Sequence, residues 1–220
     1  MDISEEPFFE LPQNDWVKTL EKNHLLIKEE LISQIKADTK KTSKWSNTYS
    51  HYASSQTKEE FPWKTFEFFF FGIQHIENCE KYPKTTELLL QIPELITAQF
   101  SMLLPKTKIK PHQGYSKLLL RNHLPLILPE KGDMGMKIKG ETRTWEKGKL
   151  LSFNDGFIHE AWNLSDQPRT VLLFDIAHPE CGYTAKEICE YKINTLKDSY
   201  LLNIAPKDQW KKWLQDGYFS

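Results

Sequence analysis

The segment from Leu95 to Ala177 most limits what this chain can fold into. It consists of short runs rich in β-branched and aromatic residues, and the runs are separated by turn sequences at Pro105, "PEKGD", "EKGK", "NDG" and "SDQP". Runs of this length with turns at short intervals are typical of antiparallel strands, whose connections are short. The pattern therefore predicts antiparallel β structure, either a sandwich or a barrel.

Helical patterns flank this β region on both sides. From Asn14, a suitable N-cap residue, to Ala37, apolar residues recur at helical spacing and predict one amphipathic helix that covers a face of a sheet. A short helix is expected near Thr85 to Ile92, and the tail from residue 183 to residue 220 returns to a helical pattern. The chain is thus expected to be mainly β with flanking helices.

Neither a repeat nor a change in composition marks a second domain. A chain of 220 residues with 39% hydrophobic and 13% aromatic residues can bury a sizeable core. We therefore expect a single domain over residues 1–220, with a helical part at about 14–37, a β core at about 63–180 and a helical tail at about 183–220. The polar stretch 39–60, which aromatic residues punctuate, is expected to be a long irregular segment that borders a binding site.

Charge and cysteine content exclude several classes of protein. With 29 Lys+Arg against 30 Asp+Glu, the chain has no basic surface excess for nucleic acid. Its acidic amino terminus does not resemble a signal peptide, and no apolar stretch approaches the ~20 residues of a membrane span. We expect a soluble, cytoplasmic protein, and the oligomeric state stays unknown. Cys79, Cys181 and Cys189 lack C-x-x-C spacing and predict buried free thiols.

Two histidines of the β region are candidate metal ligands. His112 and His159 are far enough apart in the sequence to belong to different strands. Imidazole binds iron, zinc or copper, but Gly114 stands where the familiar iron-site pattern places a carboxylate two positions after the first histidine. From these residues alone, a metal site and a pair of structural histidines both remain open.

Two arginines lie among apolar neighbours. Arg121 is part of "LLLRNHLPLIL" and Arg169 is part of "PRTVLLFD". On a strand whose alternate residues are buried, an inward guanidinium needs an anion. The residues leave open whether that anion is a ligand or a carboxylate of the chain such as Asp155 or Asp175, and whether the arginines face solvent instead.

Several motifs, in order, resemble one known family. The runs "FSMLLPKTKIKPHQGYSKLLLRNHLPLILP" and "GETRTWEKGKLLSFNDGFIHEAWNLSDQPRTVLLFDIAHPE" contain H-x-G, R-x-H, R-x-W-x-x-G-K, F-x-D-x-x-x-H-E-x-W-N and H-P-E. From about Trp63 to Glu180 the chain resembles the aspartyl/asparaginyl β-hydroxylase family of Fe(II)- and 2-oxoglutarate-dependent oxygenases. The resemblance implies a double-stranded β-helix (jelly-roll, cupin-like) fold. It also implies a dioxygenase that hydroxylates an unactivated carbon with O2 and releases succinate and CO2.

The resemblance assigns the metal ligands residue by residue. His112 and His159 match the two iron ligands of the family. Gly114 matches a glycine that stands where related oxygenases carry the third, carboxylate ligand. Asp155 matches an acidic residue close to the metal, which acts either directly on iron or through bound water.

The resemblance also implies a binding site for 2-oxoglutarate. Arg169 matches the arginine that pairs with the distal carboxylate, and Ser101 matches the serine that hydrogen-bonds the same group. Arg121 and His123 match the pair that contacts the co-substrate near its metal-chelating end, and both share one face of a strand by the period of two. Further family positions, for which packing or supporting roles are expected, are Trp145, Trp162 and His178.

Departures from the family pattern leave the substrate open. Leu119 stands where peptide-hydroxylating members carry a further arginine, and Cys79 lacks a nearby partner cysteine. An extracellular-domain aspartate is therefore a poor candidate. An aspartyl/asparaginyl-like or other small acidic substrate, free, in a peptide or carrier-bound, remains open, as does a lipid acyl chain. The alternatives are a non-catalytic double-stranded β-helix protein that binds a small anion at Arg169, and a β-sandwich interaction protein with incidental histidines.

Overall fold

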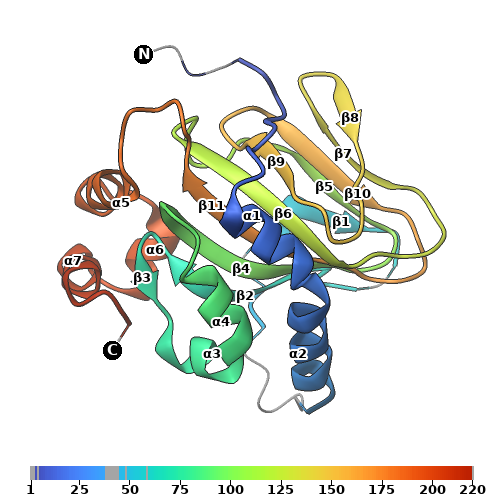
Figure 1. Ribbon diagram of the computed structural model, residues 1–220, viewed down its shortest axis with the longest axis horizontal. Helices are drawn as coiled ribbons and strands as arrows, with labels where there is room; N and C mark the ends of the chain where they lie inside the picture. Colours follow the sequence, from blue (N-terminus) through green and yellow to red (C-terminus); the bar gives the residue numbers. More distant parts are fainter. Residues whose placement is uncertain (1–2, 4, 38–44, 48, 58, 220) are drawn as a thin grey trace.

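Two antiparallel sheets that lie face to face form the centre of the fold (Figure 1). This computed structural model describes residues 3, 5–37, 45–47, 49–57 and 59–219. The larger sheet contains, in spatial order, β3 (Ile73–Gln74), β2 (Trp63–Phe70), β4 (Leu95–Leu103), β11 (Arg169–Ala177), β6 (Leu119–Ile127) and β9 (Leu151–Asn154). The smaller sheet contains β1 (Ala53–Ser55), β5 (Thr107–His112), β10 (His159–Asn163), β7 (Met134–Ile138) and β8 (Glu141–Arg143).

The strands from β4 to β11 pair as one ribbon that is folded back on itself. β4 pairs with β11, β5 with β10, β6 with β9, and β7 with β8, and every pairing is antiparallel. Successive pairs alternate between the larger and the smaller sheet, so the paired ribbon winds around the core between the sheets. This winding is the double-stranded β-helix, or jelly roll. The prediction of antiparallel β structure with this fold is confirmed.

Side chains alternate between the inner and outer faces of the central strands. On β11, Val171 and Leu173 pack between the two sheets, whereas Leu172 and Phe174 pack on the outer side with residues of the amino-terminal helices. Both faces of β11 are therefore covered, and every residue of this strand is buried. The same alternation turns Arg169 inward, because side chains two positions apart on a strand share a face.

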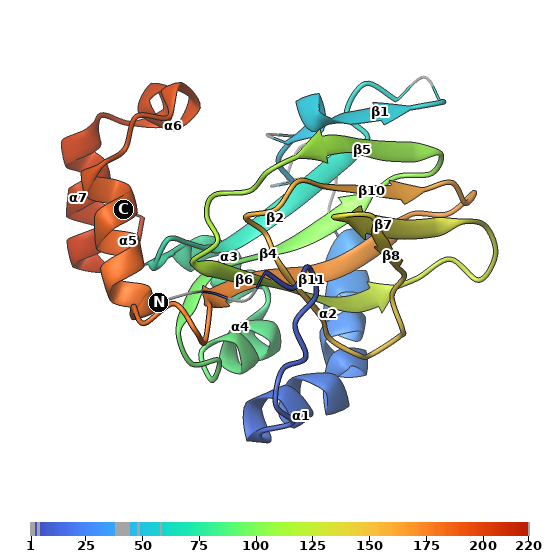
Figure 2. The same ribbon diagram turned by 90° about the horizontal axis from the view of Figure 1, so that it is seen from above.

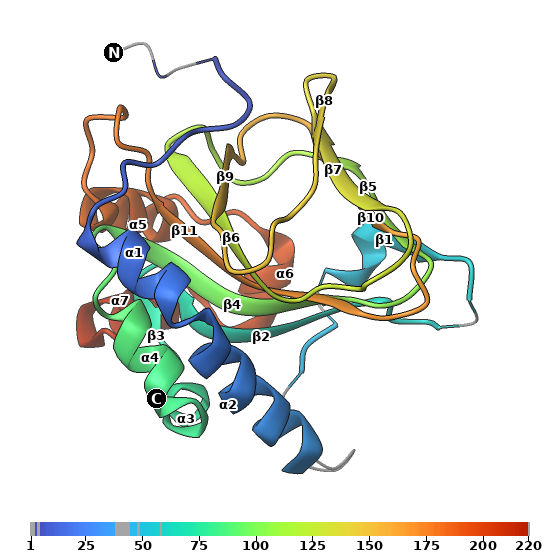
Figure 3. The ribbon, with the colours of Figure 1, turned by 45° about the vertical axis from the view of Figure 1, so that its right-hand side comes forward.

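The outer face of the larger sheet is covered by helices from the amino-terminal half of the chain (Figure 3). These helices are α1 (Asp15–Lys22), α2 (His24–Ala37), α3 (Ile76–Lys81) and α4 (Pro83–Leu89), and a 3-10 turn η1 (Ser50–Tyr52) follows α2. The helix predicted near Thr85 to Ile92 corresponds to α4. Its apolar face buries Leu88 and Leu89.

The single helix predicted for residues 14–37 is wrong, because the segment forms two helices. Asn14 caps α1 as expected, since its side-chain oxygen accepts a hydrogen bond from the Val17 amide at 3.3 Å. At Asn23 the helix stops, and the side-chain amide of Asn23 donates to the Thr19 carbonyl at 2.8 Å. The apolar spacing continues through this position, with Leu20 and Ile27 both buried, so the pattern does not reveal the interruption.

The carboxy-terminal tail is helical, as predicted, and lies at one end of the two sheets (Figure 2). It forms α5 (Ala185–Asn194), α6 (Ser199–Ile204) and α7 (Lys207–Asp216). A capping box of Thr184 and Glu187 begins α5.

Cys79, Cys181 and Cys189 are buried free thiols, which confirms the prediction. In the part of the chain that the structure describes, no helix has the length and apolar character of a membrane span.

Candidate functional site

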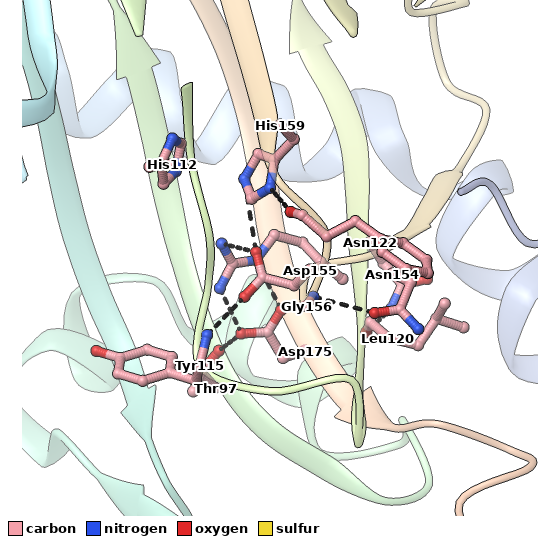
Figure 4. Close-up of polar contacts among 12 residues, drawn as sticks. Thr97, His112, Tyr115, Leu120, Asn122, Asn154, Asp155, Gly156, His159 and Asp175 are labelled. Carbon is pink, nitrogen blue, oxygen red and sulfur yellow. Dashed lines mark hydrogen bonds and ion pairs between the residues drawn. The ribbon is translucent and has the colours of Figure 1, made fainter. Parts of the chain in front are cut away.

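His112 and His159 face each other across two paired strands of the smaller sheet (Figure 4). His112 ends β5 and His159 begins β10, and their ring centroids are 4.3 Å apart. Each Nδ1 lies 2.9 Å from a backbone carbonyl oxygen, that of Lys110 for His112 and that of Phe157 for His159. Because a carbonyl only accepts hydrogen bonds, each Nδ1 carries the proton. Both Nε2 atoms are then unprotonated, as in histidines that bind metals.

Burial keeps both imidazoles neutral. It lowers the pKa of His112, and burial together with the neighbouring His112 lowers the pKa of His159 to about 3. At neutral pH each ring therefore has a free lone pair. Among the described residues no group of three His, Cys, Asp or Glu side chains is arranged to hold a metal ion.

A buried carboxylate approaches the histidine pair from Asp155, in the turn after β9. One carboxylate oxygen lies 3.7 Å from His159 Nε2, and the other accepts a hydrogen bond from the Tyr115 amide at 3.2 Å. A Cβ atom at Gly114 would lie 1.5 Å from Asp155 Oδ2. The Asp155 carboxylate thus fills the space next to His112 that a side chain at position 114 would need, and only glycine leaves that space free.

Arg121 connects Asp155 to a second carboxylate, that of Asp175 on β11. Its Nη1 lies 2.5 Å from Asp155 Oδ1, and its Nε and Nη2 donate to Asp175 at 2.8 and 2.9 Å. Burial opposes the charge of Arg121, but the two carboxylates outweigh burial and raise its pKa. Burial also raises the pKa of Asp155 to about 6, although Arg121 opposes this shift. Of the possibilities that the sequence left open, Arg121 pairs with carboxylates of the chain, and its contact with a co-substrate stays a prediction.

Arg169, by contrast, is a buried cation without an anionic partner among the described residues. Its side chain is 1% exposed, and Nε and Nη1 lack hydrogen-bond partners in the described part of the chain. The guanidinium lies 4.4 Å from the ring centroid of Trp145. Burial lowers the pKa of Arg169 to about 10, so the group is still charged at neutral pH. A buried guanidinium in this state is costly unless an anion binds it.

Two further donors belong to the inner face of the same sheet. The Trp145 Nε1–H donates to His123 Nδ1 at 3.1 Å, so the proton of this imidazole is on Nε2, which is buried and has no partner among the described atoms. Burial and the neighbouring Arg169 lower the pKa of His123 and keep the ring neutral. Ser101 accepts a hydrogen bond from Trp63 Nε1 at 3.0 Å, which leaves the Ser101 hydroxyl proton to donate. Arg169, His123 and Ser101 thus form a donor set suited to a carboxylate ligand.

A cavity of about 480 Å³ opens beside His112 and Arg121. Its lining includes residues from the larger sheet, from the turn after His112 and from the carboxy-terminal helices. Tyr49 and Tyr52 of the polar stretch 39–60 also line it, and that this stretch borders a binding site stays a prediction. Residues 39–44, 48 and 58 of that stretch lie outside the described residues.

Two residues that support the candidate site were not apparent from the sequence. Trp63 supports Ser101, and Tyr115 holds Asp155 through its backbone amide. Trp63 follows a polar stretch at the start of a strand and belongs to no motif, so only its aromatic character was a signal.

Trp162 packs against Gly135, and His178 packs edge-on against Phe9 with ring centroids 5.0 Å apart. These two residues have the packing roles that were predicted.

One protein family and several known proteins are similar to this chain in sequence. The sequence model of one family, described as Aspartyl/Asparaginyl beta-hydroxylase, matches residues 21–179. The ornithine lipid ester-linked acyl 2-hydroxylase of Rhizobium tropici is 32% identical over 175 residues, which cover 79% of this chain and 61% of that protein. The human aspartyl/asparaginyl beta-hydroxylase is 32% identical over 169 residues, 74% of this chain and 21% of that protein. The chain therefore spans less than two thirds of the length of either relative.

A solved structure is similar at a greater distance. The cupin domain of Schizosaccharomyces pombe Cnp3 is 10% identical, with a TM-score of 0.37, over 66% of this chain and 80% of that domain.

Proposed function

Because the chain belongs to the aspartyl/asparaginyl beta-hydroxylase family, we propose that it is an Fe(II)- and 2-oxoglutarate-dependent hydroxylase. The observation that carries this proposal is the buried Arg169, whose Nε and Nη1 have no hydrogen-bond partner among the described residues. Such a group requires an anion, and two neutral histidines are available to hold a metal. A metal and an organic anion are what this chemistry needs in addition to O2 and the substrate.

The donor atoms fit iron and 2-oxoglutarate. In the proposal, the Nε2 atoms of His112 and His159 hold the iron. Arg169 and the Ser101 hydroxyl bind the distal carboxylate of 2-oxoglutarate, and the His123 Nε2–H donates near its chelating end. When bound, iron and 2-oxoglutarate supply oxygen activation: one atom of O2 enters the substrate as a hydroxyl group and the other enters succinate, with loss of CO2.

Asp155 and Arg121 form a fixed polar group next to the two histidines. The Asp155 carboxylate is already bonded to the Tyr115 amide and paired with Arg121. We therefore expect it to act on the metal through water rather than as a direct ligand. Arg121, held by Asp155 and Asp175, orients this carboxylate beside His159.

The substrate is proposed to bind in the cavity beside His112. Among the described residues, this cavity is lined by His112 and Arg121 and not by Ser101, His123 or Arg169. We propose that substrate and co-substrate approach His112 from different sides. We propose an aspartyl/asparaginyl-like or other small acidic substrate whose unactivated carbon is hydroxylated. The two relatives carry names that refer to a lipid acyl group and to aspartyl or asparaginyl residues.

The proposal is tested by anaerobic titration of the protein with Fe(II) and then 2-oxoglutarate. We expect a weak visible charge-transfer band that appears only when both are present. Binding of 2-oxoglutarate that does not depend on iron would favour the alternative, a non-catalytic protein that binds a small anion at Arg169. A protein that binds neither would refute both.

We predict that Arg169→Ala raises the apparent dissociation constant of 2-oxoglutarate roughly 10-fold to 100-fold. Charge-assisted hydrogen bonds contribute about 1.5 to 3 kcal/mol each, and about 1.4 kcal/mol corresponds to one decade. Arg169→Lys should restore only part of the affinity, since a single ammonium lacks the planar fork of the guanidinium. The measurement is the 2-oxoglutarate titration of the iron-loaded protein.

The matched control for this prediction is Arg143→Ala. Arg143 lies at the surface on β8, where it pairs with Glu10 and Glu141. This variant should bind 2-oxoglutarate as the wild-type protein does. If Arg169→Ala also leaves the constant unchanged, the co-substrate is held by other residues.

A further inference from the structure

The carboxy-terminal helices supply one wall of the cavity beside His112. Lys192 of α5, Asp198 in the following loop and Leu201 of α6 line it. The family match ends at residue 179, so this wall is built by a part of the chain that lies beyond the match.

Lys192 is the residue of this wall whose surroundings indicate a role in ligand binding. It is partly buried, and its ammonium group lies 4.2 Å from the ring centroid of Tyr115 and 5.5 Å from that of Phe71. No hydrogen bond or ion pair of this ammonium group is formed with the described residues. Burial lowers the pKa of Lys192, and the nearby Asp198 opposes the shift and favours the charged form.

Lys192 is the lining cation that forms no ion pair with a carboxylate in the described part of the chain, although Asp198, which also lines the cavity, favours its charged form. Among the described residues that line the cavity, the Lys and Arg side chains are Arg121 and Lys192. Arg121 is held by the carboxylates of Asp155 and Asp175, so its charge is already balanced. A single ammonium suits one carboxylate better than a phosphate dianion, which needs several cationic partners.

Tyr115 connects Lys192 to the histidine site. Its ring lies under the ammonium group, while its backbone amide bonds the Asp155 carboxylate beside His159. The Lys192 ammonium group and the Asp155 carboxylate beside His159 therefore contact two parts of the same residue, Tyr115. The apolar and aromatic side chains that line the cavity include Tyr52, Phe69 and Leu201. Its volume of about 480 Å³ is typical of a small-molecule site.

We propose that Lys192 binds a carboxylate of the substrate, and that the substrate class is an organic acid with a short aliphatic part that extends from Lys192 toward His112. This inference rests on the proposed hydroxylase function and deepens it, because it names the residue that selects the acid.

The test compares two probes of the same shape, N-acetyl-L-leucine and its neutral amide N-acetyl-L-leucinamide. Their dissociation constants are measured by calorimetry without oxygen, on protein saturated with Fe(II) and 2-oxoglutarate so that the co-substrate site cannot bind the acid. We expect the wild-type protein to prefer the acid by on the order of 10-fold. Lys192→Met keeps the aliphatic stem over Tyr115, and it should abolish the preference.

The control variant is Lys186→Met, on the same helix. Lys186 is exposed, lies near Glu190 and does not line this cavity, so its substitution should leave the preference intact. Equal affinity for the two probes in the wild-type protein, binding of neither, or a preference that survives Lys192→Met would each overturn the inference.

The proposed function has a separate readout in the same samples. A wild-type protein that forms no visible band with Fe(II) and 2-oxoglutarate refutes the proposed hydroxylase function. A normal band with equal probe affinities refutes only the role of Lys192.

Discussion

Replacement of His112 or His159 by alanine is expected to abolish iron-dependent turnover and to remove most of the affinity for Fe(II). The proposed site has two protein ligands, and a metal that loses one of them is left with a single imidazole. Both Nε2 atoms are prepared for the metal by hydrogen bonds of Nδ1 to backbone carbonyls. Succinate formation from 2-oxoglutarate measures turnover, and anaerobic calorimetry measures iron affinity.

Two comparisons make this experiment specific. His24→Ala removes a histidine whose Nδ1 interacts with the Glu21 carbonyl on the amino-terminal helices, away from the site, and it should retain iron binding. Asp155→Ala should lower turnover but retain most of the iron affinity, because the proposal has this carboxylate act through water. If iron affinity falls equally in the Asp155 and histidine variants, Asp155 is a direct ligand and the two-histidine assignment is wrong.

Gly114→Asp is expected to destabilise the protein and to abolish turnover. A Cβ atom at this position would lie 1.5 Å from Asp155 Oδ2, so one of the two side chains must move. Overpacking in a core costs about 1 to 3 kcal/mol, which corresponds to a Tm lower by about 2 to 12 °C in a chain of this length. The displaced carboxylate would also disturb the ion pair with Arg121. Thermal unfolding and succinate release measure the two effects.

The double variant Gly114→Asp, Asp155→Gly tests whether overlap with the Asp155 carboxylate causes the effect of Gly114→Asp. It moves the carboxylate from position 155 to position 114, into the space that the Asp155 side chain leaves. We expect the double variant to be more stable than Gly114→Asp alone, so the effects of the two substitutions on stability should be strongly non-additive. If Gly114→Asp by itself is as stable and as active as the wild-type protein, the Asp155 carboxylate does not fill this space in solution.

The antiparallel arrangement was predictable because it depends on local features of the sequence. Short strands need frequent turns, and turn residues such as those of "PEKGD" and "SDQP" act within a few positions of the chain. Alternation along a strand likewise predicted that Arg121 and His123 share a face, and both positions pair with β11. The limit of such patterns appears at Asn23, where the apolar period continues although the helix stops.

The order of motifs predicted the family and the residues that form the candidate site, but not how these residues pair with one another. Nothing in the sequence near Gly114 indicates that the side chain of Asp155 occupies the space beside it. Likewise, the local sequence does not show that Arg121 has two carboxylate partners while Arg169 has none among the described residues. Lys192 joins the cavity only because α5 packs against β4 and β11. Local sequence patterns report the conformation of neighbouring residues, whereas these contacts join segments far apart in the chain, and only the packing of the two sheets and the carboxy-terminal helices brings those segments together.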